Sequence, residues 1–177
     1  MSLNYIPRKR RQEIEDVVNQ IQLNVDKAYP QDALIDIIKT SIPGISIVEH
    51  DFYGDHNIRG IIYKMSDTFK TPLIVIQKKL TKEGKAFALA HEFGHYSLGH
   101  IGSANFMTDK IHFDGSPAMQ KEAEAQFFAA SLLMPKDEFV ELMDHLTTKG
   151  LAKRFGVSEA AARVRKAWLD NERERSL

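Results

Sequence analysis

Residues 86–100 read Ala86-Phe87-Ala88-Leu89-Ala90-His91-Glu92-Phe93-Gly94-His95-Tyr96-Ser97-Leu98-Gly99-His100, and this stretch decides the predicted fold. Thr81 is a favourable N-cap residue and Gly99 a favourable C-terminal stop, so we expect a helix that runs to about Leu98. The first five residues of the stretch are apolar on every side, which is typical of a helix inside a protein. The rest of the chain should therefore pack around this helix.

Two histidines, His91 and His95, share one face of this helix, because four residues advance about 40° around the axis and about 6 Å along it. Both imidazoles can approach one metal ion. Glu92 lies about 100° away, where it can take a proton from an activated water without being a ligand. The pattern predicts a zinc site that hydrolyses peptide bonds, with Glu92 as the catalytic base.

The alternative interpretation is a buried helix whose two histidines form hydrogen bonds in the core. We favour the metal site, because burying two histidines and a glutamate without a metal or polar partners costs free energy. Gly94 lies between the histidines and weakens a helix interior by about 1 kcal/mol. Its presence indicates that another element approaches the helix closely at this point.

A catalytic zinc site has three protein ligands and one open position, so a third ligand must lie elsewhere. A third histidine six residues after His95 is excluded, because that residue is Ile101. On the next predicted helix we favour Glu124 over Glu122, because Glu124 belongs to a mostly apolar face. The residues that define this face are Phe127, Phe128 and Ser131. Three polar residues of the preceding segment are weaker candidates: Asp109, His112 and Asp114.

Other polar side chains are expected near the metal without binding it. His100 is predicted to contact the ligands from behind or to interact with the C-terminal end of the helix, and Tyr96 is a second candidate for such a contact. No motif selects the group that stabilises the oxyanion. The chemically suitable residues are Tyr53, Tyr63, Tyr96, His100 and His112.

The composition limits the alternatives. A chain of 177 residues that is 43% hydrophobic can bury a core without a metal, so a metal would serve chemistry. The absence of cysteine leaves His, Asp and Glu as strong ligands. Equal numbers of basic and acidic residues, 24 each, remove the strongly basic field typical of nucleic-acid binding. No apolar run is long enough for a membrane span, and we expect a cytoplasmic protein without a membrane partner.

We expect one α+β domain over residues 1–177. N-terminal helices are predicted within 1–43, at 12–27 and 32–41. The catalytic core at 44–135 should contain strands at 45–52, 58–65 and 73–77 in a small, mostly antiparallel sheet, and helices at 81–98 and 119–134. Further helices are predicted within 136–170. Pro72 favours either the start of a strand or an edge strand. An edge strand over 72–78 would allow an extended substrate to pair along it.

The helix ending at His100 and the later stretch Glu124-Ala125-Gln126-Phe127-Phe128-Ala129-Ala130-Ser131-Leu132-Leu133-Met134-Pro135 together resemble the ImmA/IrrE family of zinc metallopeptidases. The resemblance implies a zincin-like fold and Zn²⁺ as cofactor. It also implies that Glu124 is the third zinc ligand, and that Gln126, which replaces the usual Asn, contacts the ligands from behind. Members of that family are typically encoded by bacteria and their phages or mobile elements, and several act on a repressor-type DNA-binding protein. The resemblance therefore implies a repressor-like protein substrate.

The segment 151–167 resembles a helix-turn-helix, with Gly156 in the turn and Ser158 as the next N-cap. From Leu151 onward the chain has seven Lys and Arg against four Asp and Glu, so a DNA-binding regulator is an alternative function. The apolar residues of the segment fit equally well with helices that dock on the catalytic core. A metal-binding module that acts by protein contact without catalysis is a third possibility.

Overall fold

The structure, a computed structural model, describes residues 6–23, 31–53, 58–63, 71–101, 106–108 and 117–174. Its elements in chain order are α1 (Arg8–Leu23), α2 (Gln31–Ser41), β1 (Ser46–His50), β2 (Gly60–Tyr63), β3 (Leu73–Gln77), α3 (Lys82–Ser97), β4 (Phe106–Thr108), α4 (Pro117–Leu133), α5 (Lys136–Leu142), α6 (Thr148–Phe155) and α7 (Glu159–Glu174). The predicted α+β class is confirmed.

The four strands form one sheet in the order β1-β3-β2-β4. β1 runs parallel to β3, whereas the β2–β3 and β2–β4 pairs are antiparallel, so the sheet is mostly antiparallel as predicted. The prediction of an edge strand at 72–78 is wrong, because β3 pairs on both sides. Pro72 precedes the paired residues, so its missing N–H removes no bond from the ladder, and its carbonyl accepts from the Ser46 N–H.

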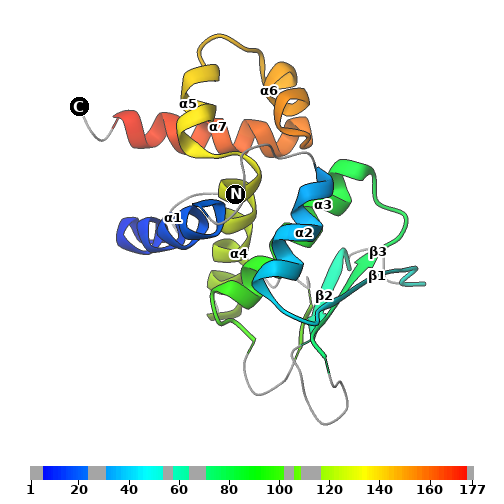
Figure 1. Cartoon of the computed structure of the whole chain (residues 1–177). Coiled ribbons are helices and arrows are strands. Elements are labelled where there is room, and N and C mark those ends of the chain that lie inside the picture. The colour runs from blue at the N-terminus through cyan, green and yellow to red at the C-terminus, as the bar shows by residue number, and fades with distance from the viewer. Residues whose placement is uncertain are drawn as a thin grey trace.

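Helix α3 packs on strands β2 and β3 and on helix α4 (Figure 1). Both predicted ends are confirmed: the Thr81 hydroxyl accepts from the Gly84 N–H at 3.1 Å, and Gly99 adopts a φ of 69° just beyond the helix. The close approach predicted at Gly94 is also confirmed. A Cβ atom at Gly94 would lie 2.9 Å from Phe128 Cδ1 on α4. The absence of a side chain at Gly94 therefore allows α3 and α4 to approach each other closely.

Helices α5, α6 and α7 form the upper part of the molecule in Figure 1, and α1 lies against α4. The turn predicted between α6 and α7 is present: Gly156 has a φ of 62°, and the Ser158 hydroxyl accepts from the Ala161 N–H at 3.1 Å. α7 also packs on α4, because Trp168 contacts Phe127 with ring centroids 5.2 Å apart. None of the helices in the described ranges is long and apolar enough to cross a membrane.

Candidate metal centre

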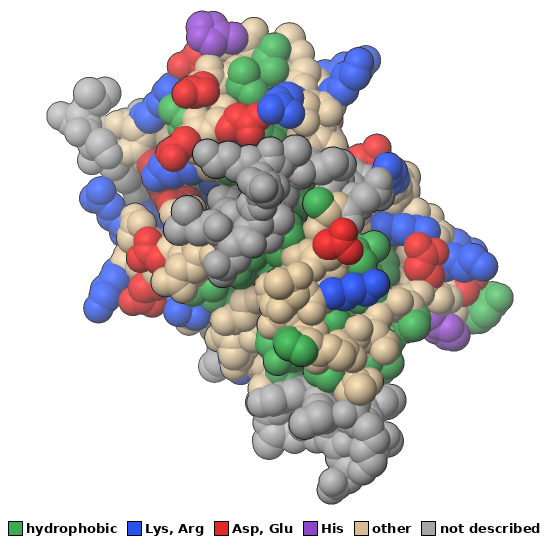
Figure 2. Space-filling view, in the orientation of Figure 1, with side chains coloured by type: hydrophobic (Ala, Val, Ile, Leu, Met, Phe, Trp, Pro, Cys, Tyr) green, Lys and Arg blue, Asp and Glu red, His purple; other side chains and the backbone are tan. Residues whose placement is uncertain are grey.

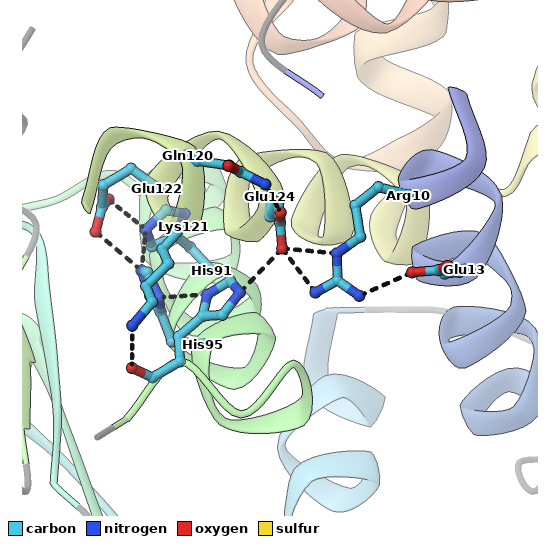
Figure 3. Close-up of polar contacts among 9 residues, drawn as sticks. Arg10, Glu13, His91, His95, Gln120, Lys121, Glu122 and Glu124 are labelled. Carbon is cyan, nitrogen blue, oxygen red and sulfur yellow. Dashed lines mark hydrogen bonds and ion pairs between the residues drawn. The ribbon is translucent and has the colours of Figure 1, made fainter. Parts of the chain in front are cut away.

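Three buried side chains converge where α3 meets α4. The Nε2 atoms of His91 and His95 are 3.1 Å apart, and the Glu122 carboxylate lies 3.2 Å from each of them (Figure 3). The three residues are only 1–3% exposed. In a tetrahedral site with metal–ligand bonds of about 2.0–2.1 Å, neighbouring ligand atoms are roughly 3.3 Å apart. The spacing and the donor set therefore fit a divalent metal ion, and this group can bind one.

The electrostatics of Glu122 suit a ligand. Burial raises the pKa of its carboxyl group, but hydrogen bonds and charge interactions with His91 and His95 outweigh burial and bring the pKa to about 2. Glu122 is therefore an ionised carboxylate at neutral pH. Metal binding requires this deprotonated form, so no proton has to leave Glu122 when a metal enters.

The sequence analysis predicts Glu124 as the third ligand, but in the structure Glu122 is the glutamate that lies beside the two histidines. Residues two apart on a helix are about 200° apart around the axis, so only one of these glutamates can face the histidines. The Glu124 carboxylate lies instead with Arg10, Gln120 and His100 (Figure 3). Arg10 and Gln120 donate hydrogen bonds that hold the pKa of Glu124 below its usual value despite burial.

This difference has a physical origin in the burial of α4. Apolar neighbours placed Glu124 on an inward face, but the residues that define this face contact two different helices, and Phe128 packs on Gly94 of α3. Phe127 packs on Trp168, and the Ser131 hydroxyl accepts a hydrogen bond from Arg165 at 3.1 Å, so much of this face contacts α7. Because α4 is covered on several sides, apolar neighbours in the sequence do not reveal which of its faces meets the histidines.

His100 lies between His95 and Glu124. Its Nδ1 atom is 3.1 Å from Nδ1 of His95, and its Nε2 atom is 3.1 Å from Glu124. Burial and the neighbouring His95 lower the pKa of His100 to about 4, although Glu124 opposes this shift. His100 is therefore a neutral imidazole at neutral pH. Lys121 donates to the His100 carbonyl at 3.4 Å and fixes its backbone.

The remaining predicted residues lie in different surroundings. Tyr96 packs against the apolar core, and the Gln126 side chain is partly buried on α4. Tyr53 is 85% exposed, with the Lys79 ammonium 5.4 Å from its ring centroid. Tyr63 ends strand β2 and is partly buried. Three further candidates, Asp109, His112 and Asp114, lie outside the described residues.

Glu92 is buried between α3 and the sheet. It is 1% exposed, and a Cβ atom at Gly60 of β2 would lie 2.7 Å from its Oε1 atom. The carboxylate therefore occupies space that any other residue at position 60 would need. Sequence analysis missed this role of Gly60, although a glycine at a strand is a known signal of close approach by another group.

A buried His-His-Glu group with a second glutamate on the His-Glu-x-x-His helix defines a site of the metallopeptidase type. The chain belongs to the M78 peptidase family described as IrrE N-terminal-like domain, which residues 40–166 match. The family resemblance is thereby confirmed, and family membership supports a metallopeptidase-type function. No curated protein matches the chain.

A solved structure of a Mycobacterium tuberculosis transcriptional regulator has a similar fold, with a TM-score of 0.60 and 18% sequence identity. The match covers 90% of this chain and 46% of the regulator chain. The present chain therefore spans less than half of that protein, and the similarity concerns the fold.

Proposed function

We propose that this protein is a zinc-dependent metallopeptidase that cleaves a peptide bond in a protein substrate. The observation that carries the proposal is the buried triangle of His91, His95 and Glu122, together with Glu92, which is buried on the same helix as the histidines. Two imidazole nitrogens and one carboxylate form a common donor set of catalytic zinc sites, which leave a fourth position open. The family match supports the same activity.

In this mechanism His91, His95 and Glu122 hold the metal. A zinc ion in this position supplies Lewis-acid activation of a water molecule and of the scissile carbonyl group. Glu92 accepts the proton of the attacking water and passes it to the leaving amine. Burial of Glu92 against Gly60 keeps the carboxylate in one place, which favours proton transfer in a fixed geometry.

We propose a DNA-binding regulatory protein of the repressor type as the substrate. Two observations support this class: the family match, and the similarity of fold to a protein described as a transcriptional regulator. A repressor encoded beside this protein on a phage or mobile element is the first candidate. Incubating the two purified proteins with zinc should give defined fragments, and mass spectrometry of the new ends identifies the cleaved bond.

The first test combines metal analysis with two variants. Purified protein should contain about one zinc per chain, and His91→Ala should lose it. Glu92→Gln should retain zinc and lose cleavage, because the amide cannot accept a proton from water. A protein that binds no divalent metal, or a Glu92→Gln variant with full cleavage activity, would refute the proposal.

A second candidate function, DNA binding, rests on the helix-turn-helix of α6 and α7. The charges weaken it, because five of the seven basic residues from Leu151 onward form ion pairs within the protein. These are Arg154–Glu138, Arg163–Glu159, Arg165–Glu15, Lys166–Asp170 and Arg173–Asp144. On the face shown in Figure 2, basic and acidic side chains intermix over the upper helices. A salt-dependent mobility shift with duplex DNA would favour this function.

A third candidate is a metal-binding module without catalysis. It predicts stoichiometric zinc together with intact substrate after prolonged incubation. Capture of the repressor-type protein by both wild-type protein and Glu92→Gln, without fragments from either, would favour this function over the peptidase.

A further inference from the structure

A continuous polar chain connects helix α1 to the metal group. Arg10 on α1 donates from Nε and Nη2 to Oε2 of Glu124, at 3.0 and 2.7 Å (Figure 3). The same Oε2 atom lies 3.1 Å from Nε2 of His100, and Nδ1 of His100 lies 3.1 Å from Nδ1 of His95. His100 uses one ring nitrogen toward Glu124 and the other toward His95, so the contacts continue from one residue to the next.

The order of donors and acceptors along this chain is fixed by its outer end. A carboxylate bound to a guanidinium group only accepts, so Nε2 of His100 must carry a hydrogen and donate it to Glu124. When Nε2 of His95 binds the metal, the hydrogen of that ring lies on Nδ1, and Nδ1 of His100, 3.1 Å away, accepts it. The Nε2 atom of His95 faces His91 and Glu122, where the metal would lie.

We propose that Arg10, Glu124 and His100 are positioning residues that hold the hydrogen of His95 on Nδ1 and its Nε2 atom toward the metal. The inference rests on the proposed metal function. It assigns a role to α1, which lies before the family-matched residues 40–166 and approaches the metal group only through folding. Partners behind a metal-binding histidine orient its ring, and their loss typically weakens metal binding by about 10–100-fold.

A purely structural ion pair between α1 and α4 would not require the carboxylate oxygen that binds Arg10 to contact His100 as well. Glu124 is 4% exposed, and its Oε1 atom already accepts from Gln120 at 2.8 Å. Arg10 instead places both donors on Oε2, the atom that also faces His100. Arg10 also pairs with Glu13 at 3.2 Å on the exposed side, which steadies the guanidinium group. The convergence of Arg10 and His100 on one oxygen connects α1 to His95.

The hydrogen positions can be read by long-range ¹H–¹⁵N NMR of histidine rings in the full-length, zinc-loaded protein. Wild-type protein should show hydrogen on Nδ1 of His95 and on Nε2 of His100, with Nδ1 of His100 free of hydrogen. Arg10→Met should shift a measurable fraction of His100 to the opposite tautomer, and Arg10→Lys should restore most of the wild-type signal. The inference is overturned if Arg10→Met leaves both rings unchanged.

Zinc affinity provides the second readout, measured by competition with a chromophoric chelator. We expect about 10-fold weaker binding for Arg10→Met and about 10–100-fold for His100→Phe. The matched control is Lys9→Met, which removes an exposed cation one residue away on the same helix and should stay within about twofold of wild type. Equal weakening by Lys9→Met, or unchanged affinity in both test variants, would contradict the inference.

The two proposals fail in distinguishable ways. Wild-type protein that binds no zinc refutes the metallopeptidase function, and the positioning role falls with it because it requires a bound metal. Conversely, the positioning role alone is refuted if wild-type protein binds zinc and cleaves its substrate while the Arg10 and His100 variants bind zinc with wild-type affinity. Thermal unfolding of each variant shows whether α1 remains docked.

Discussion

Gly94→Ala is expected to destabilise the protein, although alanine favours a helix over glycine by about 1 kcal/mol. The new Cβ atom would lie 2.9 Å from Cδ1 of Phe128 and 3.2 Å from its Cβ. Rotation of the Phe128 ring relieves only the first contact, because its Cβ atom moves with the α4 backbone. Phe128 is also fully buried and packs edge-on against Phe93, so its ring has little room to move.

The magnitude follows from these opposing effects. Overpacking a core costs about 1–3 kcal/mol, and the backbone contact favours the upper half of that range. After subtraction of the helix preference, the free energy of unfolding should fall by about 1–2 kcal/mol. For a chain of this size, each kcal/mol corresponds to roughly 2–4 °C in Tm. Urea unfolding followed by circular dichroism measures the change.

Gly150→Ala is the matched control, because Gly150 also lies in a helix. A Cβ atom there would meet Leu146 Cβ at 3.4 Å and Thr147 Oγ1 at 3.5 Å, which are ordinary contact distances. The free energy of unfolding of Gly150→Ala should be unchanged or slightly higher than that of the wild-type protein. Gly94→Ala should additionally weaken zinc binding, because α4 carries Glu122 and must move away from the histidines. A Gly94→Ala protein as stable as Gly150→Ala, with unchanged zinc affinity, would refute the reasoning.

Three further predictions concern the site and the C-terminal helices. Gly60→Ala should displace Glu92 and lower kcat about 10-fold or more while zinc content stays unchanged, as a comparison of kinetics with elemental analysis will show. Glu122→Gln should lose far more zinc affinity than Glu124→Gln in chelator competition; the reverse order would restore Glu124 as the ligand. Thr147→Ala removes the hydroxyl that accepts from the Gly150 N–H and should cost about 1 kcal/mol in urea unfolding.

The sequence predicts well those features that depend on neighbouring residues. The limits of α3 follow from Thr81 and Gly99, whose preferences act within one helical turn. The histidine pair follows from the helical period, and the close packing at Gly94 follows from the cost of glycine in a helix. The turn at Gly156 is predicted for the same reason, since a positive φ favours glycine locally.

The features that the sequence does not predict depend on contacts between distant segments. Pro72 and a short apolar run fit an edge strand, but β3 is central because residues 46–50 pair with it on one side and β2 on the other. A continuous apolar run is also typical of a strand buried on both faces, and this signal should have had more weight.

The choice between Glu122 and Glu124 shows the same limit at the active site. Helical geometry establishes that only one of them can join the histidines, but it does not say which one. The decision depends on Arg10, which is 114 residues before Glu124 and forms an ion pair with it only because α1 docks on α4. Once Arg10 and His100 bind Glu124, its carboxylate faces away from the histidines, and Glu122 is the glutamate that lies beside them. The identity of the third ligand is therefore a property of the folded chain and not of the local motif.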